Sequence, residues 1–193
     1  MNIPTPETLF DGHSGLFLEA LHGVSRYGEY GMGQSTLAVA ANTSAQVQSV
    51  DTALAWVERV ETALGVLGLP DGRVRLTHVD VGPVGNWGFP LSYDHSDRFA
   101  DYFVGPWARG FEPDLVLIDG RFRVACFLTS LLHARPGTRL LFDDYTERRY
   151  YHIVETFLQP DVRTERQALF RVPAALDRAA ISALLDRFSL VMD

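Results

Sequence analysis

The sequence is poor in cysteine, in positive charge and in long apolar runs, and each shortage excludes a class of protein. The single cysteine, Cys126, has no partner for an intramolecular disulfide and cannot build a cysteine-rich metal site. A formal charge of -7 argues against a protein that follows nucleic-acid phosphates, which normally presents a basic face. No stretch approaches the roughly 18 apolar residues of a membrane span, and residues 1–7 do not resemble a secretory signal. We therefore expect a cytoplasmic protein that binds neither nucleic acids nor membranes.

What the sequence does contain is enough apolar residues for a sizeable core. The 193 residues are 47% hydrophobic, which predicts one globular domain over residues 1–193. Strand and helix patterns alternate along it, with helices expected over 53–67, 147–158 and 174–187. This order predicts an α/β fold: a single doubly wound Rossmann-like domain, with a mostly parallel seven-stranded sheet and helices on both faces. The strands are predicted at 24–30, 47–50, 73–79, 115–118, 139–142, 168–172 and 188–192.

A glycine-rich turn at residues 27–36 ends the first predicted strand and opens a helix. Gly31 and Gly33 have no Cβ, so the backbone can take a positive φ and a ligand can approach the main chain closely. The N-H groups of the following helix point into the same crevice, and Glu29 places a carboxylate at the strand end. The pattern is typical of a cofactor-binding turn.

Acidic residues follow the later strands. Asp51 lies about 20 residues beyond the turn, where a nucleotide-binding α/β fold places a carboxylate for ribose hydroxyls. Asp80, Asp119 and the pair Asp143 and Asp144 end the next three strands. The carboxyl ends of parallel strands share one edge of a sheet, so we expect these acids to converge on one crevice.

Two segments outside the strands are candidates for the substrate side of this crevice. Residues 1–24 predict a helical cover, which either roofs a pocket, covers apolar surface or contacts a second copy in a homo-oligomer. Residues 81–112 form a long irregular loop after a strand, a typical place for specificity, although its aromatics can also simply pack on each other. The candidates for a substrate wall in this loop are Trp87, Phe89, Tyr93 and His95.

In combination, these motifs resemble the class I methyltransferases that use S-adenosylmethionine. The turn from Glu29 to Gly33 resembles their first motif, Asp51 their ribose-binding acid and Asp80 their adenine-side residue. The resemblance implies that S-adenosylmethionine is the cofactor. Its binding residues would be Glu29, Gly31, Gly33, Ser35, Asp51 and Asp80.

The second half of the chain is similar to a narrower group, the small-molecule O-methyltransferases that include the macrocin-type sugar methyltransferases. The matching runs are Asp114–Gly120 and Leu140–Tyr145. In that group, acids after the fourth and fifth strands hold a magnesium ion, which would make Asp119, Asp143 and Asp144 the metal ligands. An alternative is that one acid starts a helix, since residues 144–147 match a capping box and Thr146 is a second possible cap.

Arg121 departs from the macrocin-type pattern, which has a second acid, serving as base, at this position. Arg121 and Arg123 either belong to a solvated helix start, or one of them lies beside Asp119, where it neutralises the site and displaces the cation or binds an anionic acceptor. The sequence thus predicts an S-adenosylmethionine-dependent methyltransferase for a small polar molecule, with Asp119 and Arg121 at the catalytic centre. The rival hypothesis is an inactive ligand-binding protein that keeps the fold. An NAD-dependent oxidoreductase fits less well, because Ser35 occupies the position of a third glycine.

Overall fold

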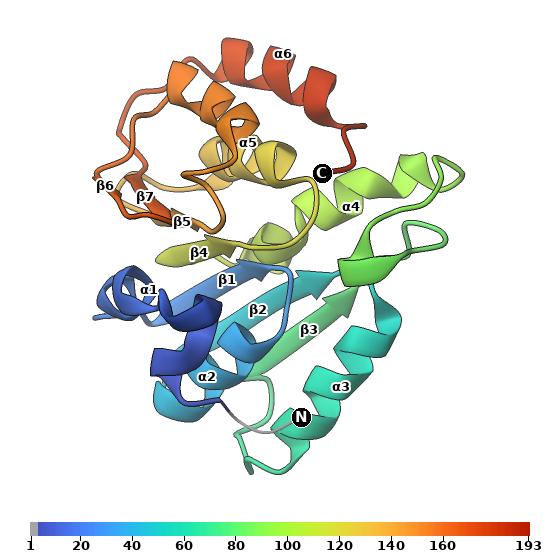
Figure 1. Ribbon diagram of the computed structural model, residues 1–193, viewed down its shortest axis with the longest axis vertical. Helices are drawn as coiled ribbons and strands as arrows, with labels where there is room; N and C mark the ends of the chain where they lie inside the picture. The colour runs from blue at the N-terminus through green and yellow to red at the C-terminus, as the bar shows by residue number, and fades with distance from the viewer. Residues whose placement is uncertain (1–3) are drawn as a thin grey trace.

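The computed structural model describes residues 4–193, and its centre is a mixed sheet of seven strands in the order β3-β2-β1-β4-β5-β7-β6 (Figure 1). Four pairings, β1 with β2, β1 with β4, β2 with β3 and β4 with β5, are parallel. The pairings of β7 with β5 and with β6 are antiparallel. The predicted α/β fold with seven strands is confirmed. The strands are β1 (Arg26–Tyr30), β2 (Gln46–Asp51), β3 (Val74–His78), β4 (Leu115–Ile118), β5 (Arg139–Phe142), β6 (Val162–Arg163) and β7 (Ala168–Arg171).

Helices cover both faces of the sheet. Figure 1 shows α1, α2 and α3 on one side of the strands, and α5 and α6 on the other. The α-helices are α1 (Gly15–Ala20), α2 (Gln34–Asn42), α3 (Leu54–Gly65), α4 (Phe99–Phe103), α5 (Arg123–His133) and α6 (Arg178–Phe188). The 3-10 helices are η1 (Pro6–Gly12), η2 (Asn86–Gly88), η3 (Ser96–Arg98), η4 (Gly105–Gly110) and η5 (Arg149–Thr156).

Strand β4 shows how the two faces are sealed. Its four apolar residues are fully buried, and successive side chains point to opposite faces. Leu115 and Leu117 belong to the core cluster under η1, α1 and α2, whereas Val116 and Ile118 belong to the cluster under α5 and η5. An uninterrupted apolar strand is what a central position between two helical layers requires.

Strand β1 lies in the middle of the sheet despite its weak β propensity, and its glycine allows η4 to pack against it. A Cβ at Gly28 would approach the side chains of Pro106 and Pro113 to 3.2 and 3.3 Å. A Cβ at Gly105 in η4 would lie only 2.8 Å from Cβ of Val50 in β2. Segment η4 therefore packs directly against the sheet because two glycines leave it room.

Two sequence-based predictions about the C-terminal part are wrong. Residues 188–192 form no strand, because α6 continues to Phe188 and the chain then runs to α5, where the Asp193 carboxylate accepts the Arg123 N-H at 2.7 Å. The seventh strand is instead β6, two exposed residues with no apolar pattern to reveal them. The helix predicted over 147–158 is the shorter 3-10 segment η5.

The two segments assigned to the substrate side contain short helices. Residues 6–20 form η1 and α1, and residues 86–110 form η2, η3, α4 and η4. Across residues 4–193, none of the helices combines the length and the apolar character needed to cross a membrane.

The contact of η4 with β2 predicts that Gly105→Ala is destabilising. The new methyl group overlaps the Val50 side chain, and overpacking of this kind typically costs about 1 to 3 kcal/mol. Gly65→Ala is the matched control, because the space around Gly65 in α3 is open and alanine is favoured over glycine in a helix by about 1 kcal/mol. Urea denaturation of both variants checks this; equal stability of the two would contradict the packing of η4.

Candidate functional site

Glu29 lies at the end of β1 inside a cage of hydroxyl groups. It has no exposed surface, and its two oxygens accept hydrogen bonds from Tyr27 (3.0 Å), Ser49 (2.9 Å), Ser35 and Thr36. Burial raises the pKa of Glu29, and the hydroxyl donors oppose that rise. These contacts join β1, β2 and the first turn of α2. Glu29 and Ser35, both predicted to bind the cofactor, therefore hold the shape of the glycine-rich turn from within.

The glycine-rich turn packs tightly against the turn after β4. Gly31 has a φ of +85°, and a Cβ there would lie 2.5 Å from Cα of Gly120. A Cβ on Gly120 would in turn collide with the hydroxyl of Tyr102, which accepts a hydrogen bond from the Arg121 N-H at 3.1 Å. Gly33 lies under the indole of Trp56. The missing side chains thus permit close packing of two strand ends.

Asp51 ends β2 beside this turn. Its carboxylate accepts the N-H groups of Met32 (3.0 Å) and Ala53 (2.8 Å), which fixes it against the glycine-rich turn. Burial raises the pKa of Asp51 to about 6, although the N-H donors and the charge of Arg121 oppose the rise. Each carboxylate oxygen has two lone pairs, so both keep one for a ligand hydroxyl.

Asp80 is exposed after β3, and its carboxylate faces the 81–112 segment. It accepts the Gly82 N-H at 3.0 Å and lies 3.3 Å from Nδ1 of His95. The Gly82 N-H, with His95 adding its charge, lowers the pKa of Asp80. In the same segment, Trp87 is 83% exposed and has a φ of +58°, an unusual conformation for a bulky residue.

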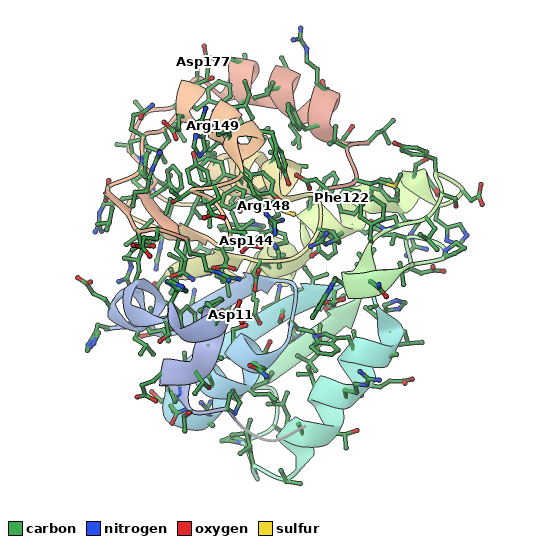
Figure 2. All side chains as sticks on the ribbon, in the orientation of Figure 1. Asp11, Phe122, Asp144, Arg148, Arg149 and Asp177 are labelled. Atoms are coloured by element: carbon green, nitrogen blue, oxygen red, sulfur yellow. The ribbon has the colours of Figure 1, made fainter. Side chains whose placement is uncertain are left out.

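Asp119, Asp143 and Asp144 meet where β4 and β5 end. One carboxylate oxygen from each lies within 4.8 Å of the others, as convergence at one edge predicts. Figure 2 labels Asp144 near the centre of the molecule, close to Arg148. Burial raises the pKa of Asp119; the charge of Arg123 opposes this, and the carboxylates of Asp143 and Asp144 add to it. We call these three residues the acid cluster.

Arg123, in the first turn of α5, is buried against the acid cluster. Its side chain is only 3% exposed. Nε donates to the Gly120 carbonyl at 2.9 Å, Nη1 to the Asp143 carbonyl at 2.7 Å, and Nη2 to Oδ1 of Asp119 at 3.1 Å. Burial by itself would lower the pKa of Arg123, but the charges of Asp119 and Asp144 outweigh it and raise the pKa. The guanidinium therefore stays charged and joins the ends of β4 and β5.

Arg166 and Arg148 contact the other side of the acid cluster. Arg166 binds both oxygens of Asp143 through Nε and Nη2, at 2.7 to 3.0 Å, and Nη2 lies 3.0 Å from Asp144. Arg148 donates to Asp144 at 2.6 Å, so Asp144 is engaged by arginines and does not cap a helix. A magnesium ion needs these same oxygens in an octahedral shell at about 2.1 Å. The residues as arranged do not fit it.

A cavity of about 320 Å³ adjoins the acid cluster, between the N-terminal segment and the turn before β7. Asp144 and Arg166 belong to its wall, and Arg166 also pairs with Asp11 of η1 at 2.9 Å. The volume is at the lower end of the range for small-molecule sites. Its lining is charged throughout: Asp11, His13, Asp144, Glu147, Arg148, Glu165 and Arg166.

Arg121 makes no ion pair within residues 4–193. Its charge is among the causes that lower the pKa values of Asp51, Tyr102 and Asp193. Nε of Arg121 is buried with no hydrogen-bond partner among residues 4–193. The arginine that pairs with Asp119 is Arg123, at 3.1 Å.

Sequence reasoning missed the parts played by Arg166 and Tyr102, whereas it weighed Arg123 together with Arg121 as the arginine beside Asp119. Arg123 left a detectable signal, because it is a charged residue four positions after Asp119 at the start of an otherwise apolar helix. Arg166 and Tyr102 left none. They come from a turn before β7 and from α4, and only the fold brings them to the ends of β4 and β5.

Comparison with known proteins places the chain in a methyltransferase-like family. No protein-family model and no curated protein matches the sequence. A crystal structure of a methyltransferase-like protein from Silicibacter pomeroyi is 34% identical, with a TM-score of 0.80 over 89% of this chain and 90% of that one. Two others share only the fold. A putative O-methyltransferase from Klebsiella pneumoniae is 19% identical, with a TM-score of 0.56 over 82% of this chain and 77% of that one. An O-methyltransferase from Bacillus cereus, in complex with SAH (S-adenosylhomocysteine), is 16% identical, with a TM-score of 0.53 over 81% of this chain and 77% of that one.

The raised pKa of Asp51 predicts a pH-dependent stability. A carboxyl group whose pKa is higher in the folded state than its ordinary 3.8 binds its proton more tightly when folded. Its contribution is therefore lost as the pH rises from about 4 through about 6, by on the order of 3 kcal/mol. Asp51→Asn removes this loss, whereas its altered hydrogen bonds add only a pH-independent offset. Urea denaturation of both proteins at several pH values between 4 and 7 measures it, and a constant difference would contradict the prediction.

Proposed function

Because this chain belongs to the class I S-adenosylmethionine-dependent methyltransferase-like family, we propose that it transfers a methyl group from S-adenosylmethionine to a small polar acceptor. The observation that carries the proposal is the position of Asp51, fixed beside the glycine-rich turn by the Met32 N-H, with lone pairs left for two hydroxyls. A ribose offers such a hydroxyl pair. The family likeness and this geometry agree on the donor.

We assign donor binding to the half of the crevice between β1, β2 and β3. Asp51 accepts the ribose hydroxyls, Asp80 lies on the adenine side, and Gly31 and Gly33 shape the turn that the donor follows. Bound there, S-adenosylmethionine supplies a methyl group on an electrophilic sulfonium. The protein contributes orientation, since an in-line displacement depends on how donor and acceptor are aligned.

Arg121 is suited to hold a carboxylate in the same crevice. The charge of Arg121 acts on Asp51, the proposed ribose-binding acid, and its buried Nε has no hydrogen-bond partner among residues 4–193. A guanidinium recognises a carboxylate through paired N-H donors. The carboxylate is that of the donor's methionyl group or of an anionic acceptor.

Asp119 is the proposed proton acceptor. Its Oδ1 binds Arg123, which leaves Oδ2 for the hydroxyl or amine of the acceptor. Deprotonation makes that group a better nucleophile, and a positioned base of this kind typically contributes about 10² to 10⁴ in rate. The charged cavity beside Asp144 would hold the acceptor, because ionic and hydroxyl groups on a small molecule can bind its acids and arginines. No step uses a metal.

Calorimetric titration with S-adenosylhomocysteine tests the donor site. We expect saturable binding by the wild-type protein and a dissociation constant at least about tenfold higher for Asp51→Ala, because loss of hydrogen bonds to a ribose costs more than about 1.4 kcal/mol. Arg121→Gln separates the two carboxylates. It weakens S-adenosylhomocysteine binding if Arg121 holds the donor, and raises only the acceptor KM if Arg121 holds the acceptor.

Asp161→Asn serves as the control in that titration, since Asp161 pairs with Arg171 on the surface and lies outside the crevice. Absence of binding to wild-type protein at millimolar ligand would contradict the proposed function. So would binding that Asp51→Ala leaves unchanged.

Turnover tests the proton acceptor. Wild-type protein with S-adenosylmethionine and a panel of small polar acceptors should release S-adenosylhomocysteine, and Asp119→Asn should lower kcat by about 10² or more while donor affinity is retained. If Asp119→Asn keeps full kcat with the same acceptor, Asp119 is not the base.

A further inference from the structure

The ends of β4 and β5 carry three carboxylates in the arrangement of a divalent cation site, but arginines already occupy their oxygens. We infer that Arg123 and Arg166 are the resident cations of the acid cluster, so that the wild-type protein holds no divalent metal there and acquires a metal site when Arg166 is neutralised. The inference concerns metal binding and does not depend on methyl transfer.

The oxygens of Asp143 show most directly that arginine already occupies the acid cluster. Its carboxylate has no exposed surface and accepts Nε and Nη2 of Arg166 and Nε2 of Gln167, all between 2.7 and 3.0 Å. The guanidinium binds both oxygens in the bidentate geometry typical of arginine–carboxylate pairs. These are the oxygens that a metal ion would need. A cation cannot reach these oxygens unless Arg166 moves away.

Charge gives the same result as geometry. The three carboxyl groups of Asp119, Asp143 and Asp144 are matched by three guanidinium groups within 4.0 Å of them, those of Arg123, Arg148 and Arg166, and Arg166 also pairs with Asp11. A divalent ion would add two positive charges to a partly buried network that already holds three. An uncompensated charge in such surroundings is strongly unfavourable.

Arg166 is the arginine whose removal tests the inference. Arg123 is 3% exposed and joins two strand ends, so its loss would leave buried carboxylates unpaired and threaten the fold. Arg166 is 24% exposed at the edge of the cavity, so solvent and ions reach the space that its side chain leaves. Arg166→Gln removes the charge and keeps an amide donor. Arg166→Lys keeps the charge and removes the fork.

The experiment is titration of the purified protein with Mn²⁺, with the paramagnetic resonance signal of free Mn²⁺ measured after removal of other metals by chelation. We expect no saturable binding by the wild type or by Arg166→Lys, and one bound Mn²⁺ per chain for Arg166→Gln. Adding Asp144→Asn to Arg166→Gln should abolish the gained site. Arg171→Gln makes the same charge change on β7 outside the cluster and should leave binding absent.

Two outcomes would overturn the inference. The first is stoichiometric Mn²⁺ binding by the wild type that Asp144→Asn abolishes. The second is a folded Arg166→Gln, verified by circular dichroism, that binds no more Mn²⁺ than the wild type. If Arg166→Gln does not fold, the wild-type titration still decides the first outcome, and Arg166→Ser takes its place for the second.

Discussion

The buried guanidinium of Arg123 is the contact on which the carboxyl edge of the sheet depends. It reaches the backbone of the β4 turn, the carbonyl of Asp143 after β5 and the side chain of Asp119 at once. A charge that is 3% exposed is tolerated only where every N-H finds an acceptor and a counter-ion is near. Arg123 therefore stabilises the acids that surround it, and the acids keep Arg123 charged.

Glu29 joins the structural elements in the other half of the crevice, as Arg123 does at the acid cluster. Hydroxyl groups take the place of a counter-ion. Its four hydroxyl donors come from β1, β2 and α2, so one carboxylate joins the three elements that define the glycine-rich turn. Asp51 then attaches to the outside of that turn through the Met32 N-H. The crevice thus has an inner carboxylate that sets its shape and an outer one available to a ligand.

The two halves of the crevice differ in what they can bind. The Asp51 carboxylate accepts two backbone N-H groups and makes no ion pair within the described residues, which is why we propose it for the ribose hydroxyls. At the acid cluster the carboxylates of Asp143 and Asp144 are neutralised from within, and Oδ2 of Asp119 is left over. An acid at the end of a strand can therefore bind a ligand, bind a metal or stabilise the fold, depending on which positively charged group contacts it.

Much of the fold and part of the site were predictable from local sequence. The apolar run at 115–118 predicts a central strand because burial on both faces leaves no polar position, and the acids after successive strands meet because parallel strands share an edge. Strand β6 and the 3-10 segment η5 were not predictable. A two-residue exposed strand has no periodicity, and the length of a helix is decided by what it packs against.

The sequence by itself determined the α/β architecture, the glycine-rich turn and the positions of the strand-end acids, because periodicity and glycine placement are local properties of the chain. Only the tertiary structure decided which side chains face those acids. Arg121 and Arg123 are two residues apart, yet Arg123 pairs with Asp119, whereas no ion pair joins Arg121 to a described residue. Arg166 comes from a turn 23 residues beyond Asp143. Such pairings depend on how distant segments pack, which no local pattern encodes.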